Sequence, residues 1–538
     1  MSAPTTTRAT GADNTGPGST GPDSTAMSHR QILEALSGLL LALFVAMLSS
    51  TIVSTALPTI IGSLDGSQTQ YTWVVTATLL TATATTPIWG KLADLYSKKN
   101  LIQASIVIFL LGSIVAGLAQ SAGQLIAARA FQGIGVGGLQ ALVQVAIAAM
   151  IPPRERGRYN GYLGGVMAVA TVGGPLLGGL IVDTSWLGWR WCFFIGVPVA
   201  LIALGVLQRT LRLAVVRRDD VRIDYAGATL IAAGVSLLLI WVSFVDSSFA
   251  WLSWQTAAMV GAGLALLALA GWVESRAEEP VVPLQIVRRR TTALVIVASL
   301  AVGLAMFGGA VFLGQYFQIG RGYSPTEAGL LTIPLMAGVL VASTVSGQLI
   351  SRTGKIKPYI LAGTIVLVAG FGVLATIDHT TSLVRLGIGM ALVGIGVGMS
   401  MQNLVLAVQN TVPLRDLGAA SSTIAFFRSL GGTIGVSVLG AILARRVTDD
   451  ITARLAAAGV PTGGASTGNL NLAELPPAMQ TVVRAAYGDA TGHIFAIAAG
   501  IAVVGVVAAA FLKPVGLRDT LDLGTAEPAR GTDSPAGR

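Results

Sequence analysis

The stretch GKLADLYSKKN, from Gly90 to Asn100, returns in altered form as GQLISRTGKIK, from Gly347 to Lys357, and each copy joins two long apolar segments. Two further echoes lie 261 residues apart. GIGVG at 133–137 returns at 394–398, and PPRERG at 152–157 returns as PLRDLG at 413–418. Three landmarks in the same order indicate an internal duplication, and therefore a fold with two related halves.

The composition is that of a membrane protein. Hydrophobic residues make up 53% of the 538 positions, charged residues make up 11%, and the mean hydropathy is +0.73. A net charge of +9 suggests nucleic acid in a soluble protein, but here the basic residues gather in short links between apolar segments, which indicates membrane topology. The single cysteine, Cys192, excludes an intrachain disulfide. With only three histidines, we expect no metal site and no cofactor.

Counting stretches of about 20 mostly apolar residues predicts fourteen membrane-spanning helices. They are expected at 35–57, 71–90, 101–119, 124–146, 161–182, 190–208, 225–245, 254–273, 294–317, 328–350, 359–377, 384–406, 418–443 and 491–512. Alternate links carry the Lys and Arg residues, at 98–99, 154–158, 209–222, 288–290 and 352–357. These links are therefore expected in the cytoplasm together with both termini, which makes a multi-pass protein of the cell membrane.

The repeat divides the chain into an all-α integral membrane architecture of two six-helix bundles plus an inserted helix pair. We expect a disordered cytoplasmic tail at 1–32, the first bundle at 33–210, the inserted pair with its links at 211–290, and the second bundle at 291–513. The second bundle includes a long outer loop at 444–490, and a second disordered tail follows at 514–538. Duplicated bundles of this kind are common in secondary transporters, because two similar halves can rock about a site between them.

The link after the second span carries Gly90, Leu92, Asp94, Lys98 and Lys99. This pattern resembles the G-x-L-a-D-r-x-G-r-k loop of the major facilitator superfamily, whose fold is the bundle arrangement above. In that family the position of Asp94 latches the two halves through basic partners and a helix N-terminus, so the resemblance implies a conformational latch at Gly90, Asp94, Lys98 and Lys99. The alternative is that the lysines only set orientation and Asp94 is solvated. The second copy of the loop has Ser351 in place of the aspartate.

Two further motifs strengthen the resemblance. Arg129, inside the fourth span, stands in a match to R-x-x-Q-G, and the family implies a part in proton coupling; snorkelling to the outer surface is the alternative. The fifth span resembles the antiporter motif G-x-x-x-G-P-x-x-G-G, which favours export. Its residues, expected to pack closely against a helix of the other half, are Gly174, Pro175, Gly178 and Gly179. Packing of glycines alone is the alternative.

The first span ends similarly to the fourteen-span drug:proton antiporters, but Ser49 stands where that family usually has an aspartate. The middle of each expected span contains no Asp or Glu. Antiport needs a group that exchanges protons, and a carboxylate in an apolar pocket suits this. The remaining candidates are Glu327, at the outer start of the tenth span, and then Asp183 and Asp246. Each of them can instead be a helix cap or a surface charge.

Polar, aromatic and sulfur-containing side chains in the spans are candidates for a substrate cavity, because they suit varied amphipathic guests and because polar groups avoid lipid. Packing against lipid or neighbouring helices is the alternative for each apolar member. The candidates are Ser49, Gln140, Gln144, Met306, Tyr316, Gln402, Asn403, Phe427 and Arg428.

The sequence therefore predicts a monomeric, proton-coupled exporter of small amphipathic molecules that works in the lipid bilayer by alternating access. Its partners are the substrate and protons, with no nucleic acid. An exporter of an endogenous lipid or secondary metabolite is the alternative. A membrane sensor or enzyme is disfavoured, because the sequence contains no recognisable nucleophile–base pair, metal cluster or phosphate-binding loop.

Overall fold

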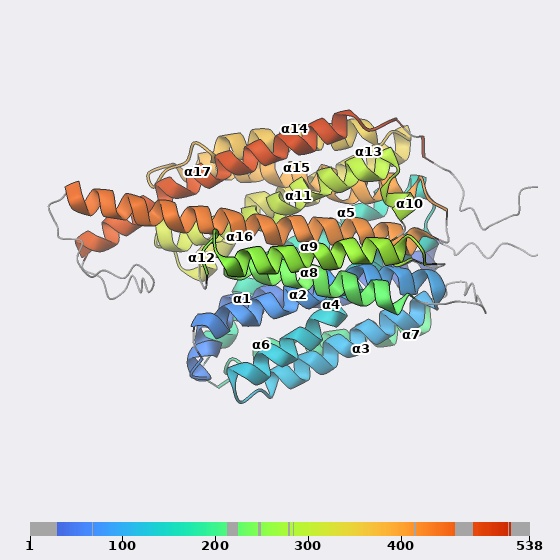
Figure 1. Ribbon diagram of the computed structural model, residues 1–538, viewed down its shortest axis with the longest axis horizontal. Helices are drawn as coiled ribbons and strands as arrows, with labels where there is room; N and C mark the ends of the chain where they lie inside the picture. The colour runs from blue at the N-terminus through green and yellow to red at the C-terminus, as the bar shows by residue number, and fades with distance from the viewer. Residues whose placement is uncertain are drawn as a thin grey trace, which may run out of the picture.

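The computed structural model describes residues 29–66, 68–184, 186–211, 224–245, 249–277, 280–282, 284–413, 416–457, 477–514 and 516–517. Its long helices run side by side along the long axis of the molecule (Figure 1). Twelve of the helices in these ranges are long and apolar enough to cross a membrane. Because lipid offers no hydrogen bonds to a backbone, such a chain satisfies its amides and carbonyls within each helix.

The first half of the bundle comprises α1 to α7. Their bounds are α1 His29–Ser63, α2 Gln68–Leu95, α3 Lys98–Gly117, α4 Ala122–Met150, α5 Pro153–Asp183, α6 Trp191–Phe194 and α7 Gly196–Thr210. Two clusters of buried apolar side chains lie within residues 32–211 and form its core.

The second half follows the inserted helices α8 Tyr225–Phe244 and α9 Trp254–Glu274 and the short α10 Leu284–Val287. It comprises α11 Arg290–Gln315, a π-helical turn η1 Tyr316–Gly320, α12 Pro325–Leu331, α13 Ile333–Thr353, α14 Lys357–Leu374, α15 Leu383–Gln409, α16 Leu417–Ala457 and α17 Pro477–Ala510. One large apolar cluster, drawn almost entirely from residues 286–512, forms its core.

The predicted count of fourteen spans stays a prediction. The helices α2 and α8 are not among the twelve that meet the length and hydropathy criteria. The helix α2 is rich in Thr, and α8 has a shorter apolar stretch, Ala226–Val242. Both nevertheless pack lengthwise beside other helices of the bundle.

The repeated GIGVG segments have the same packing role in both halves. In the copy at 133–137 the outer two glycines face α2 and the middle one faces α3. In the copy at 394–398 the outer two face α13 and the middle one faces α14. A Cβ atom on either middle glycine would lie 2.6–2.7 Å from a backbone atom of the neighbouring helix, so only glycine permits these approaches.

The two halves meet along two equivalent interfaces, because α2 corresponds to α13 and α5 corresponds to α16 in the repeat. The helix α2 packs on α16, and α13 packs on α5. The related sequence stretches thus occupy matched places in the two halves.

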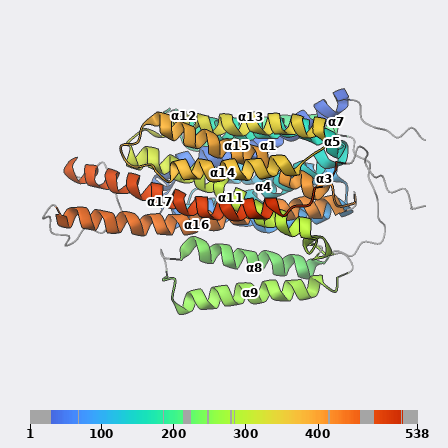
Figure 2. The ribbon, with the colours of Figure 1, turned by 90° about the horizontal axis from the view of Figure 1, so that it is seen from above.

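The inserted pair covers only one of these interfaces. Residues Ala228, Ile231, Val235 and Leu239 form an apolar stripe on α8 that packs with side chains of α2 and α16, including Phe426. The helix α9 lies on the outer side of α8, away from the bundle (Figure 2). The pair therefore covers the α2–α16 interface and leaves the α5–α13 interface without such a cover.

Several helices extend beyond the expected span boundaries. The helix α1 begins at His29, inside the expected tail 1–32, while residues 1–28 lie outside the described part of the chain. The expected outer loop 444–490 is largely helical, since α16 continues to Ala457 and α17 begins at Pro477. The extended ends of α16 and α17 project beyond the other helices (Figure 1).

Apolar stripes explain these extensions. Val447, Ile451 and Leu455 recur at four-residue intervals on α16 and belong to the same buried cluster as Val483 and Ala486 of α17. At the other end, Gly516 belongs to the expected C-terminal tail 514–538 but accepts a hydrogen bond from Asn410 at 2.9 Å; residues 518–538 are outside the described ranges.

Replacing a packed glycine should lower the stability of the fold. In Gly394→Ala the new methyl group would overlap the carbonyl oxygen of Leu335, so we expect a loss of about 1–3 kcal/mol, seen as a lower thermal midpoint in detergent. Gly372→Ala is the matched control, because no described atom outside its own helix lies within 4 Å of its Cβ position and Ala favours helix. An equal fall in both variants would contradict this packing role.

Candidate functional site

The carboxylate of Asp94 joins the two halves of the protein. Asp94 lies at the end of α2, and its Oδ1 and Oδ2 accept hydrogen bonds from the backbone N–H groups of Gly418 and Ala419, each at 2.7 Å. These amides belong to the first turn of α16, where the helix has unpaired N–H groups and the positive end of its dipole. We call this contact the latch, and the end of the bundle where it lies the latch end.

Glycines make the latch possible. A Cβ atom on Gly90 would overlap Ser422 and lie 2.6 Å from the carbonyl oxygen of Gly418, and one on Gly418 would overlap the carbonyl oxygen of Gly90. The backbones of α2 and α16 therefore approach closely enough for the short Asp94 side chain to span them. Gly418 is the last residue of the repeated PLRDLG segment.

The predicted basic members of the latch lie in different surroundings. Lys99 donates a hydrogen bond from Nζ to the carbonyl oxygen of Gln208 at 2.7 Å, so it binds the C-terminal turn of α7 within the first half. This contact suits the negative end of that helix dipole. Lys98 begins α3, four residues after Asp94.

Arg156 forms a second connection between the halves at the latch end, which the sequence reasoning assigned only to membrane topology. Its side chain is 3% exposed and donates to the carbonyl oxygens of Ala148 at 2.5 Å and Ile151 at 2.7 Å. It also donates to Oε1 of Gln409 on α15 at 3.1 Å, and the Gln409 amide donates to Ser421 on α16 at 2.9 Å. The sequence feature that could have pointed to this role of Arg156 is its place in the repeated PPRERG segment.

Arg129 lies in a buried polar chain inside the first half. Its Nη1 donates to Oε1 of Gln132 at 2.6 Å, and the Gln132 amide donates to Ser113 at 2.7 Å and, at 3.5 Å, to Ser49. These four side chains are each 5% exposed or less. The alternative of snorkelling is therefore wrong for Arg129, because its guanidinium is enclosed by protein.

Ser49, placed in the predicted cavity set, thus belongs to the Arg129 chain. It lies on α1, whereas Ser113 is on α3 and Gln132 on α4. Within the described residues, Nε of Arg129 has no hydrogen-bond partner, and the recorded partner of its Nη1 is an amide. A buried guanidinium with incomplete pairing is costly, which makes this site a candidate for a functional role.

The antiporter-type motif on α5 packs on both halves. Gly174 and Gly178 face α1 of the same half, where a Cβ on Gly178 would lie 2.9 Å from the carbonyl oxygen of Ile52. The expectation that these glycines face the other half is wrong. Pro175 and Gly179 do face it, since they lie against Gly329 and Thr326 of α12.

Among the predicted cavity residues, two meet across the halves. The Gln144 amide of α4 donates to Oε1 of Gln402 on α15 at 2.9 Å. Gln140 lies one turn before Gln144 and is half-buried. This pair is a polar contact between the halves, within seven residues of the ends of α4 and α15 at the latch end.

The remaining predicted cavity residues are used within the second half or beside the inserted pair. Asn403 donates to the carbonyl oxygen of Met399 at 2.6 Å and to Ser346 at 3.3 Å. Tyr316, fully buried, donates to the carbonyl oxygen of Asp378 at 2.7 Å, away from the latch end. Met306 packs against the core of the second half, and Phe427 packs edge-on against Phe426 at 5.1 Å.

Arg428 is a further buried arginine, in addition to Arg129 and Arg156. It is 7% exposed, and its Nη1 has no hydrogen-bond partner within the described part of the chain. Its own backbone packs tightly against Gly303 of α11, where a Cβ would overlap the carbonyl oxygen of Arg428.

Glu327 has the geometry of a helix cap. Its Oε2 accepts from the amide of Ser324 at 2.8 Å and from the Ser324 hydroxyl at 2.9 Å, while Ser324 accepts from the Glu327 amide at 3.2 Å. This capping box begins α12, and the Glu327 side chain is exposed. The geometry favours capping, and the proton role stays a prediction. Asp246 and the side chain of Asp183 lie outside what the structure describes.

Comparison with known proteins places this arrangement in a family. The sequence pattern of the Major Facilitator Superfamily matches residues 39–436. The chain is 35% identical over 493 residues to an uncharacterized MFS-type transporter of Mycobacterium tuberculosis, covering 90% of this chain and 70% of the relative. It is also 35% identical over 422 residues to the multidrug transporter protein MdtP of Bacillus subtilis, covering 78% and 77%.

The fold is similar to that of two solved transporters. The proton:xylose symporter XylE aligns with a TM-score of 0.58 at 14% identity, covering 90% of this chain and 96% of that one. The human organic anion transporter MFSD10 aligns with a TM-score of 0.57 at 13% identity, covering 88% and 99%. Identities this low concern the fold alone, whereas the sequence match decides membership: the chain belongs to the Major Facilitator Superfamily.

Proposed function

We propose that this protein is a secondary active exporter of small amphipathic molecules. The observation that carries the proposal is the latch, in which one carboxylate of the first half binds the start of α16 in the second half. A contact of this kind is useful to a protein whose halves must separate and close again. The relative MdtP is a multidrug transporter, which supports a small-molecule substrate. Another relative, 30% identical over 482 residues, is the efflux pump dotC of Dothistroma septosporum, which supports export as the direction.

The proposed cycle uses the contacts at the latch end. While Asp94 caps α16 and Arg156 holds Gln409, that end of the central contact between the halves is closed. Substrate uptake requires both contacts to break together, which exposes the contact between Gln144 and Gln402 and the space beyond it. Reformation of the contacts then favours release at the opposite end, so that substrate binding and helix capping compete for the same conformational equilibrium.

We further propose that the driving force is proton entry, that the latch end faces the cytoplasm with both termini, and that the protein is a monomer of the cell membrane. The basic links support this orientation. Arg129 is proposed to take part in coupling through its fixed, buried positive charge. Its hydrogen-bond partners are an amide and hydroxyls, which do not take up a proton near neutral pH, so a carboxylate such as Glu327 stays the candidate for binding the proton.

Export of an endogenous secondary metabolite is the second candidate. One relative, 29% identical over 505 residues, is the Acurin A biosynthesis cluster MFS-type transporter of Aspergillus aculeatus. The two candidates share a mechanism and differ only in the molecule that is moved.

Gradient dependence tests the proposed coupling. In proteoliposomes with an imposed pH gradient, we expect the wild-type protein to move a lipophilic dye faster than without the gradient. Arg129→Gln should remove most of that acceleration, because it removes the buried charge. Ser49→Ala should keep it, because the Gln132–Ser49 contact is long at 3.5 Å. Dye movement that is indifferent to the gradient in the wild type would count against proton coupling.

Loss of the latch charge should cripple transport. In Asp94→Asn the amide nitrogen cannot accept the second backbone N–H, and the attraction between a carboxylate and the helix dipole is lost. We expect the transport rate per molecule to fall at least about tenfold, since two charge-assisted hydrogen bonds contribute about 1.5–3 kcal/mol each. Asp65→Asn is the matched control: this exposed residue has a positive φ of 49°, which asparagine tolerates. If Asp94→Asn transports as fast as the wild type at equal membrane abundance, the proposed role of the latch is wrong.

Strengthening the second connection should slow the cycle. Gln409→Glu would present a carboxylate to Arg156 in place of an amide oxygen 3.1 Å away, and charge-assisted pairs are about twice as strong as neutral ones. We expect a higher thermal midpoint together with a severalfold lower maximal transport rate. Gln409→Ala should lower the thermal midpoint and, like Asp94→Asn, should also lower the transport rate, because the closed state then forms less readily. A higher midpoint with unchanged transport would show that this contact does not open during the cycle.

A further inference from the structure

A groove opens on the side of the bundle where α1, α5 and α13 meet, and it takes no part in the latch or the polar chains above. It encloses about 720 Å³. Its lining residues are Ser37, Leu40, Leu41, Phe44, Gly161, Tyr162, Gly165, Val166, Val169, Leu340, Thr344 and Gln348. Since α1 and α5 belong to the first half and α13 to the second, the groove lies across the boundary between the halves.

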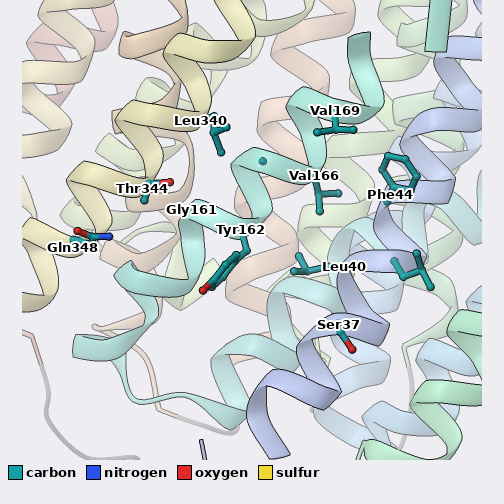
Figure 3. Close-up of a pocket in the computed structure, with 12 residues that line it drawn as sticks. Ser37, Leu40, Phe44, Gly161, Tyr162, Val166, Val169, Leu340, Thr344 and Gln348 are labelled. Carbon is teal, nitrogen blue, oxygen red and sulfur yellow. The ribbon is translucent and has the colours of Figure 1, made fainter. Parts of the chain in front are cut away.

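The lining is amphipathic and uncharged. Ser37, Tyr162 and Gln348 lie at one end of the groove, and Phe44 and Val169 lie farther along it (Figure 3). The first end is nearer the latch, because α5 starts there at Pro153 and α13 ends there at Thr353. Tyr162 is the second residue of the apolar span Gly161–Val182 within α5, so the polar part of the groove lies near the membrane interface on that side. None of the twelve lining residues carries a charge, which suits a neutral guest better than a cation.

The groove faces the side of the bundle, where the membrane lies. Tyr162 is 49% exposed, Val169 is 59% exposed and Leu340 is 39% exposed. Its floor is the tight α5–α13 contact, where a Cβ on Gly161 would lie 3.0 Å from the Cα atom of Thr344. Any separation of the halves at the latch end must open this contact and connect the groove with the middle of the bundle.

The internal repeat gives the groove a counterpart that is filled. With the offset of 261 residues, Gly165, Val166 and Val169 correspond to Phe426, Phe427 and Leu430 of α16. Those three side chains belong to the cluster in which the inserted helix α8 packs. The inserted helices therefore cover one of the two equivalent sites on the bundle, where the large side chains of α16 contact α8. At the groove the same positions hold smaller residues, one glycine and two valines, and leave space.

We propose that this groove is the lateral entry site for neutral amphipathic substrates, which enter it from the membrane leaflet at the latch end with the polar part toward Tyr162 and Gln348 and the apolar part toward Phe44. This proposal rests on the proposed export function and adds to it the route of entry and the class of substrate.

Binding in the groove can be measured without transport. Cys192 is the single cysteine, so Cys192→Ser provides a background in which Val166→Cys carries a bimane label in the groove and Val504→Cys, on the exposed side of α17, carries it elsewhere. The probe is N-phenyl-1-naphthylamine, a neutral dye, in nanodiscs. We expect energy transfer from dye to bimane to saturate at position 166 and to rise linearly at 504. Leu340→Trp should abolish the saturation, and the milder Leu340→Phe should weaken it.

Transport measurements then distinguish the proposed role of the groove from the proposed export function. In proteoliposomes Leu340→Trp should raise the KM for the dye at least about tenfold with little change in the maximal rate, while Val504→Trp should leave both unchanged. If the wild type transports the dye but energy transfer at position 166 does not saturate, the groove is not the entry site. The same conclusion follows if both Leu340→Trp and Leu340→Phe leave the KM unaltered. Transfer that stays linear because phospholipid holds the site would overturn the proposed entry site equally. Saturable binding without transport would leave the groove standing and sink the export proposal.

Discussion

Close backbone approach at glycines is the constraint on which the rest of this structure depends. In a bilayer, helices gain little from the hydrophobic effect on meeting one another, so contact area and short polar contacts decide which helices pair. At Gly90 and Gly418 the approach lets a side chain as short as aspartate reach the free amides of another helix. The same principle, applied at the two GIGVG segments, sets α4 between α2 and α3 and α15 between α13 and α14. Packing and the proposed latch therefore share one physical cause.

The distribution of charge inside the bundle is unusual for a proposed proton-coupled carrier. Arg129 and Arg428 are buried with incomplete hydrogen bonding in the described part of the chain, and Arg129 is held by an amide and, through it, by hydroxyls. Ser49 occupies the position where related antiporters have an aspartate, and it joins the same polar chain. A carboxylate there would neutralise the guanidinium, so a chain with serine keeps a buried positive charge. That charge makes Arg129 the focus of the proposed coupling.

The inserted helix pair breaks the symmetry between the two interfaces. On one side, Phe426 and Leu430 pack with α8, and the inserted pair shields the α2–α16 contact that contains the latch. On the other side, small residues at the equivalent positions leave a groove open toward the membrane. The protein is duplicated, yet one of its two equivalent interfaces is covered and the other is accessible. In our proposal the substrate enters at the accessible interface for this reason.

The internal repeat, the apolar segments and the motif spacing by themselves determined the membrane class, the paired halves and the family, because these depend on local pattern and on rules that hold for any chain in lipid. The contact between Asp94 and a helix N-terminus was implied only by the resemblance to that family. The sequence did not show how far α16 and α17 extend. Their outer ends are polar on most faces, and the apolar stripe on each becomes a buried contact only when the two helices lie together. Only the tertiary structure decided that Arg156 reaches Gln409, that Gln144 meets Gln402, and that Gly174 and Gly178 face α1. Each of these depends on which face of a helix meets which neighbour, and a difference of one residue turns a side chain through about 100° on an α-helix.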